Sequence, residues 1–198
     1  MNRIVYKVDD CLSDEFGTNK DVVKSFWRFI EIVKNIKVSI GIIGRSINII
    51  PPTVLIQIKK GIFRGNIELY NHGYEHVRDG VPICSKDDAE RNQEAIERVF
   101  GVVPKVYGAP MNAADRIPGL AMTFYGGDIP ISGYHELELW DGHEKFVRTE
   151  DYKPPKDGET KVYQMHPWVW SEKDFADFES ILKRQKENGA EWIFPTEL

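Results

Sequence analysis

Residues 68–76 read Glu-Leu-Tyr-Asn-His-Gly-Tyr-Glu-His, and this stretch decides how the rest of the chain is interpreted. The residues at 66–69 predict a short β-strand that leads directly into two histidines. His72 and His76 are four residues apart, so one turn of α-helix would place both imidazoles on the same side. Two imidazoles at that spacing can bind one divalent metal ion, with nitrogens at roughly 2.0–2.1 Å if the ion is zinc.

Two other parts of the sequence carry groups of matching chemistry. Asp9 and Asp10 end a β-rich run over 3–8, and His166 follows an apolar strand predicted over 161–165. Two imidazoles, a carboxylate ligand, a second carboxylate and a distant histidine are the components of a metal-assisted hydrolase. Neighbouring residues of a regular strand face opposite sides, so Asp9 and Asp10 can converge only where the strand bends or ends.

Strands and helices alternate along the chain, which predicts a parallel sheet, open or closed into a barrel. A length of 198 residues fits one domain over 1–198. In either form of the sheet, ligands bind at the carboxyl ends of the strands. Helices are predicted over 21–32, capped by Asp21, then over 52–60, 86–100 and 172–188; further strands are predicted over 38–43, 105–107 and 192–194. The residues that directly follow predicted strands are Asp9, Asp10, His72, residues 108–110 and His166.

Composition excludes several classes of protein. With 41% hydrophobic residues the chain can build a core, and its net charge of −5 argues against nucleic acid or an anionic membrane as the main partner. Cys11 and Cys84 are too few and too far apart for a disulfide framework or a cysteine zinc site. No transmembrane segment is expected, since the most apolar stretch, 38–58, is interrupted by polar residues and two prolines. The first ten residues show no signal sequence, so a cytoplasmic protein is expected.

These motifs together resemble those of the polysaccharide deacetylases with NodB homology, carbohydrate esterase family four. Residues 7–10, Lys-Val-Asp-Asp, stand where that family has Thr-Phe-Asp-Asp, and residues 71–76 are similar to its Asn-His-(Ser/Thr/Gly)-x-x-His motif. Residues 162–166 resemble its final histidine-bearing strand, and residues 192–198 are similar to its closing Phe-Val-Thr-Leu-Ser-Glu-Leu. The resemblance covers essentially the whole chain and implies an α/β fold, the distorted (β/α) barrel of that family.

The resemblance also implies roles for individual residues. Asp10, His72 and His76 become the ligands of one divalent metal ion; zinc is the expected ion, with cobalt, manganese, nickel and iron as alternatives. Asp9 becomes the general base and His166 the general acid. The implied activity removes an N-acetyl, or N-formyl, group from an amino sugar. The expected substrate is a small-molecule or lipid-linked precursor of a surface polysaccharide, of the lipopolysaccharide or O-antigen type.

The third motif departs from the family pattern. The family has Arg-Pro-Pro-Tyr-Gly, whereas residues 108–112 read Gly-Ala-Pro-Met-Asn. The arginine that would hold the base is therefore missing, and Arg116 and Arg148 are candidates to replace it from elsewhere. The backbone N–H near Met111 remains a candidate oxyanion donor and substrate contact, because that role needs no particular side chain.

Two alternatives remain open at this point. Residues 72–76 also match His-x-x-Glu-His, the inverted zincin signature, in which Glu75 would be the base of a metallopeptidase. Gly73 weakens the helix which that motif needs, and the interpretation leaves the aspartate pair and His166 unexplained. The second alternative is a catalytically degenerate relative that binds a sugar, and the missing arginine supports it. In either sugar-binding case Trp168, two residues after His166, is the predicted stacking aromatic.

Overall fold

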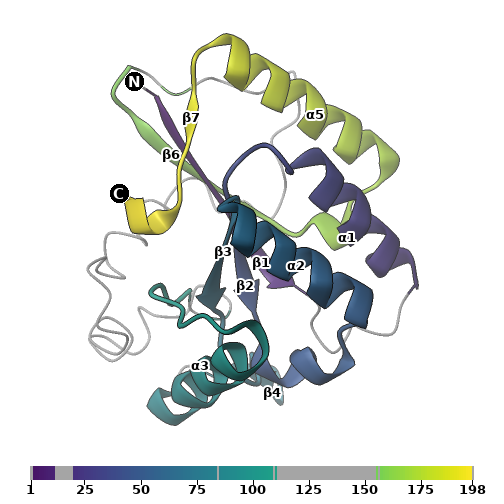
Figure 1. Cartoon of the computed structure of the whole chain (residues 1–198), viewed down its shortest axis with the longest axis vertical. Coiled ribbons are helices and arrows are strands. Elements are labelled where there is room, and N and C mark those ends of the chain that lie inside the picture. The colour runs from purple at the N-terminus through teal and green to yellow at the C-terminus, as the bar shows by residue number, and fades with distance from the viewer. Residues whose placement is uncertain are drawn as a thin grey trace.

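Five strands form the central sheet, and every pairing in it is parallel. This computed structural model describes residues 2–11, 20–83, 85–108, 110, 155 and 157–197. The strand order is β3 (Ile67–Asn71), β2 (Val38–Ile42), β1 (Arg3–Cys11) and β6 (Thr160–Met165), with β7 (Glu191–Trp192) paired to β1 (Figure 1). A separate antiparallel pair joins β4 (Val77–Arg78) and β5 (Val81–Pro82). The predicted alternation is confirmed, although the strand expected over 105–107 is reduced to one bridge between Asn71 and Tyr107.

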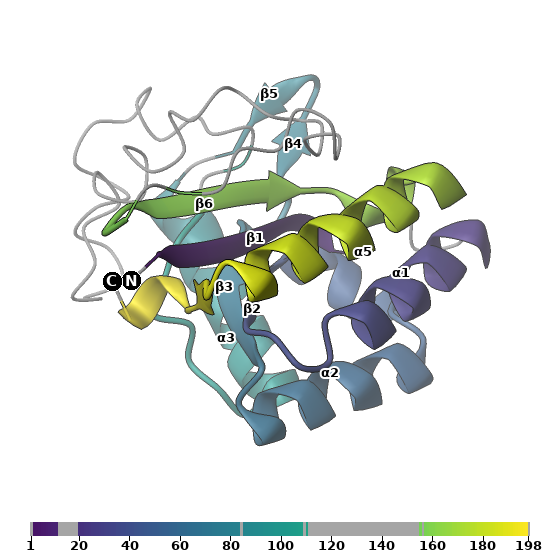
Figure 2. The ribbon, with the colours of Figure 1, turned by 90° about the horizontal axis from the view of Figure 1, so that it is seen from above.

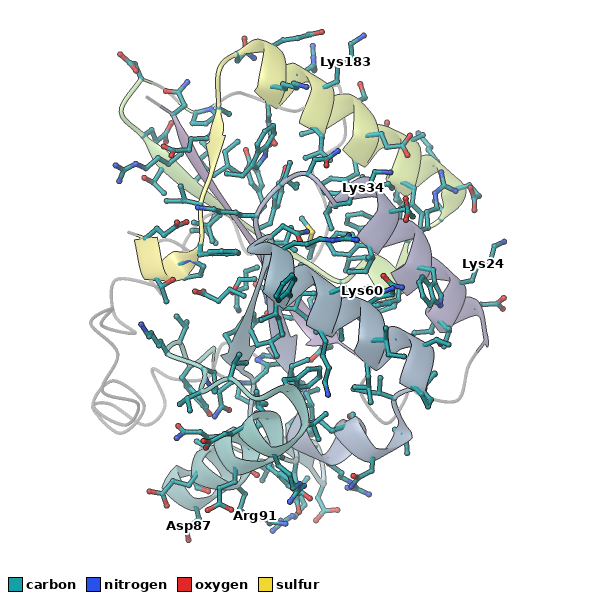
Figure 3. The ribbon with its side chains drawn as sticks, viewed as in Figure 1. Lys24, Lys34, Lys60, Asp87, Arg91 and Lys183 are labelled. Carbon is teal, nitrogen blue, oxygen red and sulfur yellow. The ribbon has the colours of Figure 1, made fainter. Side chains whose placement is uncertain are left out.

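Three helices lie on one side of this sheet, as the two views show (Figures 1 and 2). They are α1 (Lys20–Ile32), α2 (Pro52–Arg64) and α5 (Glu172–Glu187); α3 (Lys86–Phe100) packs against β3 and the 3-10 turn η1 (Gly44–Ile49), and shorter turns are η3 (Pro167–Val169) and η4 (Pro195–Glu197). The labelled lysines of α1, α2 and α5 point outward from these helices (Figure 3). None of the described helices combines the length and the apolar character that a bilayer crossing needs.

Helix ends follow local sequence signals. The Ser85 hydroxyl accepts the N–H of Asp88 and begins α3, and Gly101, with φ of 73°, ends it. Pro52 occupies the first turn of α2, as predicted. The expected cap at Asp21 is wrong, because α1 already includes Lys20 and Asp21 therefore lies inside its first turn.

Side chains alternate along β1, so core residues lie on one face of the strand and residues of the candidate site lie on the other. Ile4, Tyr6 and Val8 are fully buried in the main hydrophobic core, together with aromatic residues of α1 and α5. Lys7 and Asp9 occupy the alternate positions, where they are buried but polar. The helix-covered face of β1 therefore supplies packing, and its opposite face supplies charge.

A β-bulge at the end of β1 brings two consecutive aspartates toward one rim. The pairing of β1 with β2 shifts register between Val8 and Cys11, and Asp10 has a left-handed φ of 53°. A positive φ is unusual for a residue with a side chain and marks a conformation held by its surroundings. The bend that convergence of Asp9 and Asp10 requires is thus confirmed.

The helix expected around the histidine pair is absent from residues 72–76, which the structure describes completely. β3 ends at Asn71, and the chain then turns through Gly73, with φ of 80°, and His76, with φ of 63°, before β4 begins. The two imidazole rings nevertheless lie 4.9 Å apart between centroids. The helical placement was wrong, and a tight loop brings the rings together instead.

Candidate active site

Three potential ligand atoms converge at the carboxyl ends of β1 and β3. Asp10 Oδ1 lies 3.2 Å from His72 Nε2 and 2.9 Å from His76 Nε2. One donor atom from each of the three residues lies within 4.8 Å of the other two. The bulge of β1 presents Asp10, the end of β3 presents His72, and the following loop presents His76. The structure therefore brings together the ligand set that the sequence predicts.

The hydrogen bonding around this cluster fits a metal ion. His72 Nδ1 lies 2.6 Å from the carbonyl oxygen of Gly108, which can only accept, so Nδ1 carries the proton. The Nε2 lone pair of His72 consequently faces Asp10, an arrangement typical of histidine ligands. Within the described part of the chain, Asp10 Oδ1 is buried and has no hydrogen bond of good geometry despite its two imidazole neighbours. Such a donor set of two nitrogens and one oxygen suits zinc or another divalent first-row ion.

A buried carboxylate of α3 holds the loop that carries the histidines. Asp88 accepts the backbone N–H of Tyr74 at 2.6 Å and that of Glu75 at 3.1 Å. Asn71 Oδ1 accepts the N–H of Gly73 at 3.0 Å. Asp88 was not predicted from the sequence as a support of the site, because an acidic residue three positions after Ser85 is typical of the first turn of a capped helix.

Glu75 faces away from the role that the inverted zincin alternative gives it. Its carboxylate accepts a hydrogen bond from Arg78 Nε at 2.8 Å and a second from Arg78 Nη2. The helix which that motif needs is replaced by a loop over 72–76. The geometry that a metallopeptidase of this type requires is therefore not present at the histidine pair.

The carboxylate of Asp9 is held by three donors. Lys7 Nζ lies 3.0 Å from Asp9 Oδ2, and the side-chain amide of Gln164 donates to the same oxygen. The hydroxyl of Tyr70 donates to Asp9 Oδ1 and lies 3.1 Å from the carbonyl oxygen of Val8. We call Lys7, Tyr70 and Gln164 the Asp9 socket.

Two glycines make room for this socket. Gly41 lies on β2, between β1 and β3, opposite Tyr70 in register. A Cβ on Gly41 would lie 2.5 Å from the Tyr70 hydroxyl oxygen, so the ring crosses β2 only because no side chain is there. A Cβ on Gly108 would lie 2.7 Å from the same ring and 3.3 Å from Lys7 Cε. Close backbone approach at both positions lets Tyr70 and Lys7 reach Asp9.

Buried charges of opposite sign set the protonation of the site. Burial alone would raise the pKa of Asp9, but Lys7, with the histidines after it, outweighs burial and holds that pKa below its usual range. Burial would raise the pKa of Asp10 as well, but the close imidazoles of His166, His72 and His76 outweigh it and hold that pKa well below its usual range. Both carboxylates are therefore ionised at neutral pH. Their combined negative charge favours a cation among the imidazoles.

His166 lies at the other oxygen of Asp10. Its Nε2 is 3.3 Å from Asp10 Oδ2, and its ring packs edge-on to Trp168 at 6.2 Å between centroids. Trp168 is 4% exposed and belongs to the main hydrophobic core, so its predicted role as a sugar-stacking side chain is wrong. A ring buried among core side chains has no free face for a sugar; its contact with His166 is structural.

The predicted residues that lie outside the described part of the chain are Met111, Arg116 and Arg148.

No protein-family model matches the sequence, and no curated protein matches it either. Solved structures do match. The chain is similar to the Xyl-CE4 domain of a multidomain xylanase from the hindgut metagenome of Trinervitermes trinervoides, with a TM-score of 0.58 and 14% identity over 99% of this chain and 87% of that one. It is also similar to a family 4 acetyl xylan esterase from Clostridium thermocellum in complex with a cobalt ion, with a TM-score of 0.52 and 17% identity over 100% and 89%.

A third similar structure is a carbohydrate esterase family 4 pseudoenzyme from Bacillus anthracis. Its TM-score is 0.55, with 17% identity over 100% of this chain and 64% of that one. These likenesses confirm the fold that the sequence motifs imply, the distorted (β/α) barrel of NodB-type polysaccharide deacetylases. At identities of 14–17% they establish the fold alone, because one fold can carry many activities.

Proposed function

We propose that this chain is a metal-dependent hydrolase that removes an acyl group, acetyl or formyl, from the nitrogen of an amino sugar, and that residues 1–198 form one catalytic domain. The observation that carries the proposal is the convergence of Asp10, His72 and His76, with the ionised Asp9 next to Asp10 and His166 at its second oxygen. Structures with the same fold support a carbohydrate substrate, since those named above include an acetyl xylan esterase.

Each residue has a separate part in the proposed reaction. Asp10, His72 and His76 would hold the ion, which when bound supplies a Lewis acid that polarises the acyl carbonyl and makes water more acidic. Asp9 accepts the proton of the attacking water; a carboxylate has about four acceptor positions, and the three donors of the socket leave about one for this proton. His166 donates a proton to the sugar amine as the carbon–nitrogen bond breaks.

His166 distinguishes the amide from an ester substrate. An amine is a poor leaving group unless it is protonated, whereas an activated ester leaves without that help. An enzyme built for N-acyl sugars should therefore depend strongly on His166. The substrate that we propose is a small-molecule or lipid-linked sugar precursor of a surface polysaccharide.

A substrate panel tests this proposal. The purified protein is freed of metal, supplied in turn with zinc, cobalt, manganese, nickel or iron(II), and incubated with N-acetylated and N-formylated sugar nucleotides, lipid-linked sugars, chito-oligosaccharides, acetylated xylan and peptides. Release of acetate or formate from a sugar nitrogen is the expected result. Peptide cleavage without any deacylation, or no hydrolysis with any ion, contradicts the proposal. A variant with both His72→Ala and His76→Ala is the control for contaminating activity.

A sugar-binding protein without catalysis is the second candidate. The missing arginine of the third motif favours it, and so does the likeness to the pseudoenzyme from Bacillus anthracis. Calorimetric titration with the same sugars separates the two candidates: binding without turnover, in the presence of every ion of the panel, indicates a binding protein.

A further inference from the structure

Asp9 is a buried carboxylate that needs a compensating positive charge. Its side chain is 1% exposed, and that of Lys7 is not exposed at all. A carboxylate in such surroundings is held ionised only by a close cation and by hydrogen bonds. Lys7 Nζ, 3.0 Å from Asp9 Oδ2, provides both.

We propose that Lys7 is the positioning residue of the general base: it fixes the orientation of the Asp9 carboxylate from within the same strand, where the third motif offers no arginine. This inference rests on the proposed function for its catalytic consequence. Lys7 acts through Asp9 and touches no substrate.

The strand makes Lys7 a rigid support. Residues two apart on a strand face the same side, so Lys7 and Asp9 are neighbours without any intervening loop. Lys7 is paired in register with Gln164, the second donor to Asp9 Oδ2. Its stem packs beside Gly108, and its ammonium lies 6.0 Å from the ring centroid of Tyr70. The whole socket is consequently built from strands and close backbone contacts, which hold catalytic groups more accurately than loops do.

A purely structural ion pair would show the same contacts, so the test must separate the two roles. If Lys7 acts through Asp9, its loss should slow water attack and leave substrate binding alone. Its loss should also cost nothing further once the Asp9 carboxylate has been removed. A structural role predicts neither pattern.

The kinetic test uses Lys7→Met, Asp9→Asn and the double variant, all with measured metal content. Lys7→Met has nearly the same shape without the charge and should lower kcat about 10²-fold, the cost of roughly 1 Å of misplacement, with KM and metal content unchanged. The same loss is expected on an N-acyl sugar and on an activated ester, because water attack is common to both. The double variant should be no slower than Asp9→Asn.

A control variant removes a lysine from another, partly exposed ion pair. Lys37 pairs with Glu197 far from the metal cluster in sequence and at the amino end of β2, and Lys37→Met should leave kcat unchanged. Full kcat in Lys7→Met while Asp9→Asn loses activity overturns the inference and leaves the proposed function standing. A further loss in the double variant also overturns it, since Lys7 would then act independently of Asp9.

Thermal unfolding of the metal-free chain gives a readout that needs no activity. Lys7→Met and Asp9→Asn should each lower Tm by on the order of 10 °C, because each leaves one buried charge unpaired, and the double variant should regain much of the loss. Additive losses overturn the ion pair itself. If the wild type hydrolyses no acylated sugar, the proposed function fails and the positioning role fails with it, whereas coupling in Tm still shows the pair in solution.

Discussion

Carboxylates at both ends of the parallel sheet are largely shielded from solvent, but their pKa values shift in opposite directions. At the carboxyl end, Asp9 and Asp10 lie among Lys7 and three histidines, and the pKa of each aspartate is lowered. At the amino end of β3, Glu68 is half-buried, and burial, as the largest cause, raises its pKa to about 6. One fold therefore keeps a charge at one end of its sheet and disfavours it at the other.

The partners of Glu68 explain the difference. Its carboxylate accepts hydrogen bonds from the hydroxyls of Ser39, at 3.5 Å, and Thr196. The nearby carboxylate of Glu197 raises the Glu68 pKa further, and Lys105 lowers it only as the smallest cause. Hydroxyls satisfy an acceptor without neutralising it, whereas lysine and histidines stabilise the ionised form. The comparison teaches that nearby cations keep the carboxylates of the proposed active site ionised, whereas the hydroxyl donors at Glu68 leave burial as the dominant effect on its pKa.

Removing the proposed metal ligands should abolish the site at the carboxyl end of the sheet. Asp10→Ala, or His72→Ala with His76→Ala, should abolish both activity and stoichiometric metal, because a triad that loses one ligand no longer completes the site. Elemental analysis of dialysed protein should give about one equivalent for wild type. Glu75→Gln is the matched control in the same loop, since its carboxylate pairs with Arg78, and it should keep both properties. Equal metal content in wild type and in the ligand variants would refute the assignment.

Removing the neighbouring carboxylate should have a different effect. Asp9→Asn should keep the metal and lower kcat roughly 10²–10⁴-fold, the usual contribution of a general base. His166→Asn should also spare the metal, with a smaller loss on an activated ester than on an N-acyl sugar. Single-turnover rates on both substrates give the measurement. Full activity of Asp9→Asn would mean that a group other than Asp9 takes the proton.

Local signals in the sequence carried most of the fold. Ser85 begins α3 through a side-chain hydrogen bond, Gly101 ends it in a left-handed conformation, and Pro52 begins α2 with its fixed φ. The approach of Asp10 to His72 followed from one rule, that the carboxyl ends of parallel strands share a rim. These features depend on a few adjacent residues or on strand direction, and so a single sequence predicts them.

The support of the site could not be predicted in the same way. A lysine alternating with apolar residues in β1 has the pattern of a solvent-exposed face, and only the assembled sheet shows that Lys7 is buried. The loop that carries His76 is likewise held by a residue of another element, since Asp88 of α3 accepts the backbone N–H groups of Tyr74 and Glu75. The predicted role of Trp168 was wrong because it relied on sequence distance. Its nearness to His166 suggested a substrate contact, but the assembled core buries its ring.

Asp88 tests how far the ligand loop depends on its support. Asp88→Ala removes the acceptor of two loop N–H groups and should weaken metal affinity roughly 10–100-fold, as loss of an outer-shell partner does. Competition with a chelator of known affinity measures the change. Asp87→Ala is the control, because Asp87 lies in the same first turn of α3 and points into solvent (Figure 3). Unchanged affinity in Asp88→Ala would show that the loop holds its shape unaided.

Substitution of Glu68 should have the smallest effect, and it tests the raised pKa at the amino end of the sheet. Below about pH 4.5 the carboxyl is protonated in both the folded and the unfolded chain and its burial carries no electrostatic penalty. As the pH rises to about 6 the unfolded chain loses the proton first, so stability falls, and above that range the full cost is present. An increase from 4.5 to about 6 corresponds to about 2 kcal/mol.

Glu68→Gln should remove this dependence while keeping most of the hydrogen bonds to the side chain. Relative to wild type, its Tm should rise between pH 4 and pH 8 by about 4–8 °C, the shift that about 2 kcal/mol produces in a chain of this size. Glu94→Gln, an exposed substitution on α3, should change Tm little at either pH. Metal content and kcat of Glu68→Gln should equal those of wild type, because Glu68 lies at the end of β3 opposite to His72. A Tm difference that stays constant with pH would mean that Glu68 is already neutralised by a cation, and the contrast between the two ends of the sheet would then disappear.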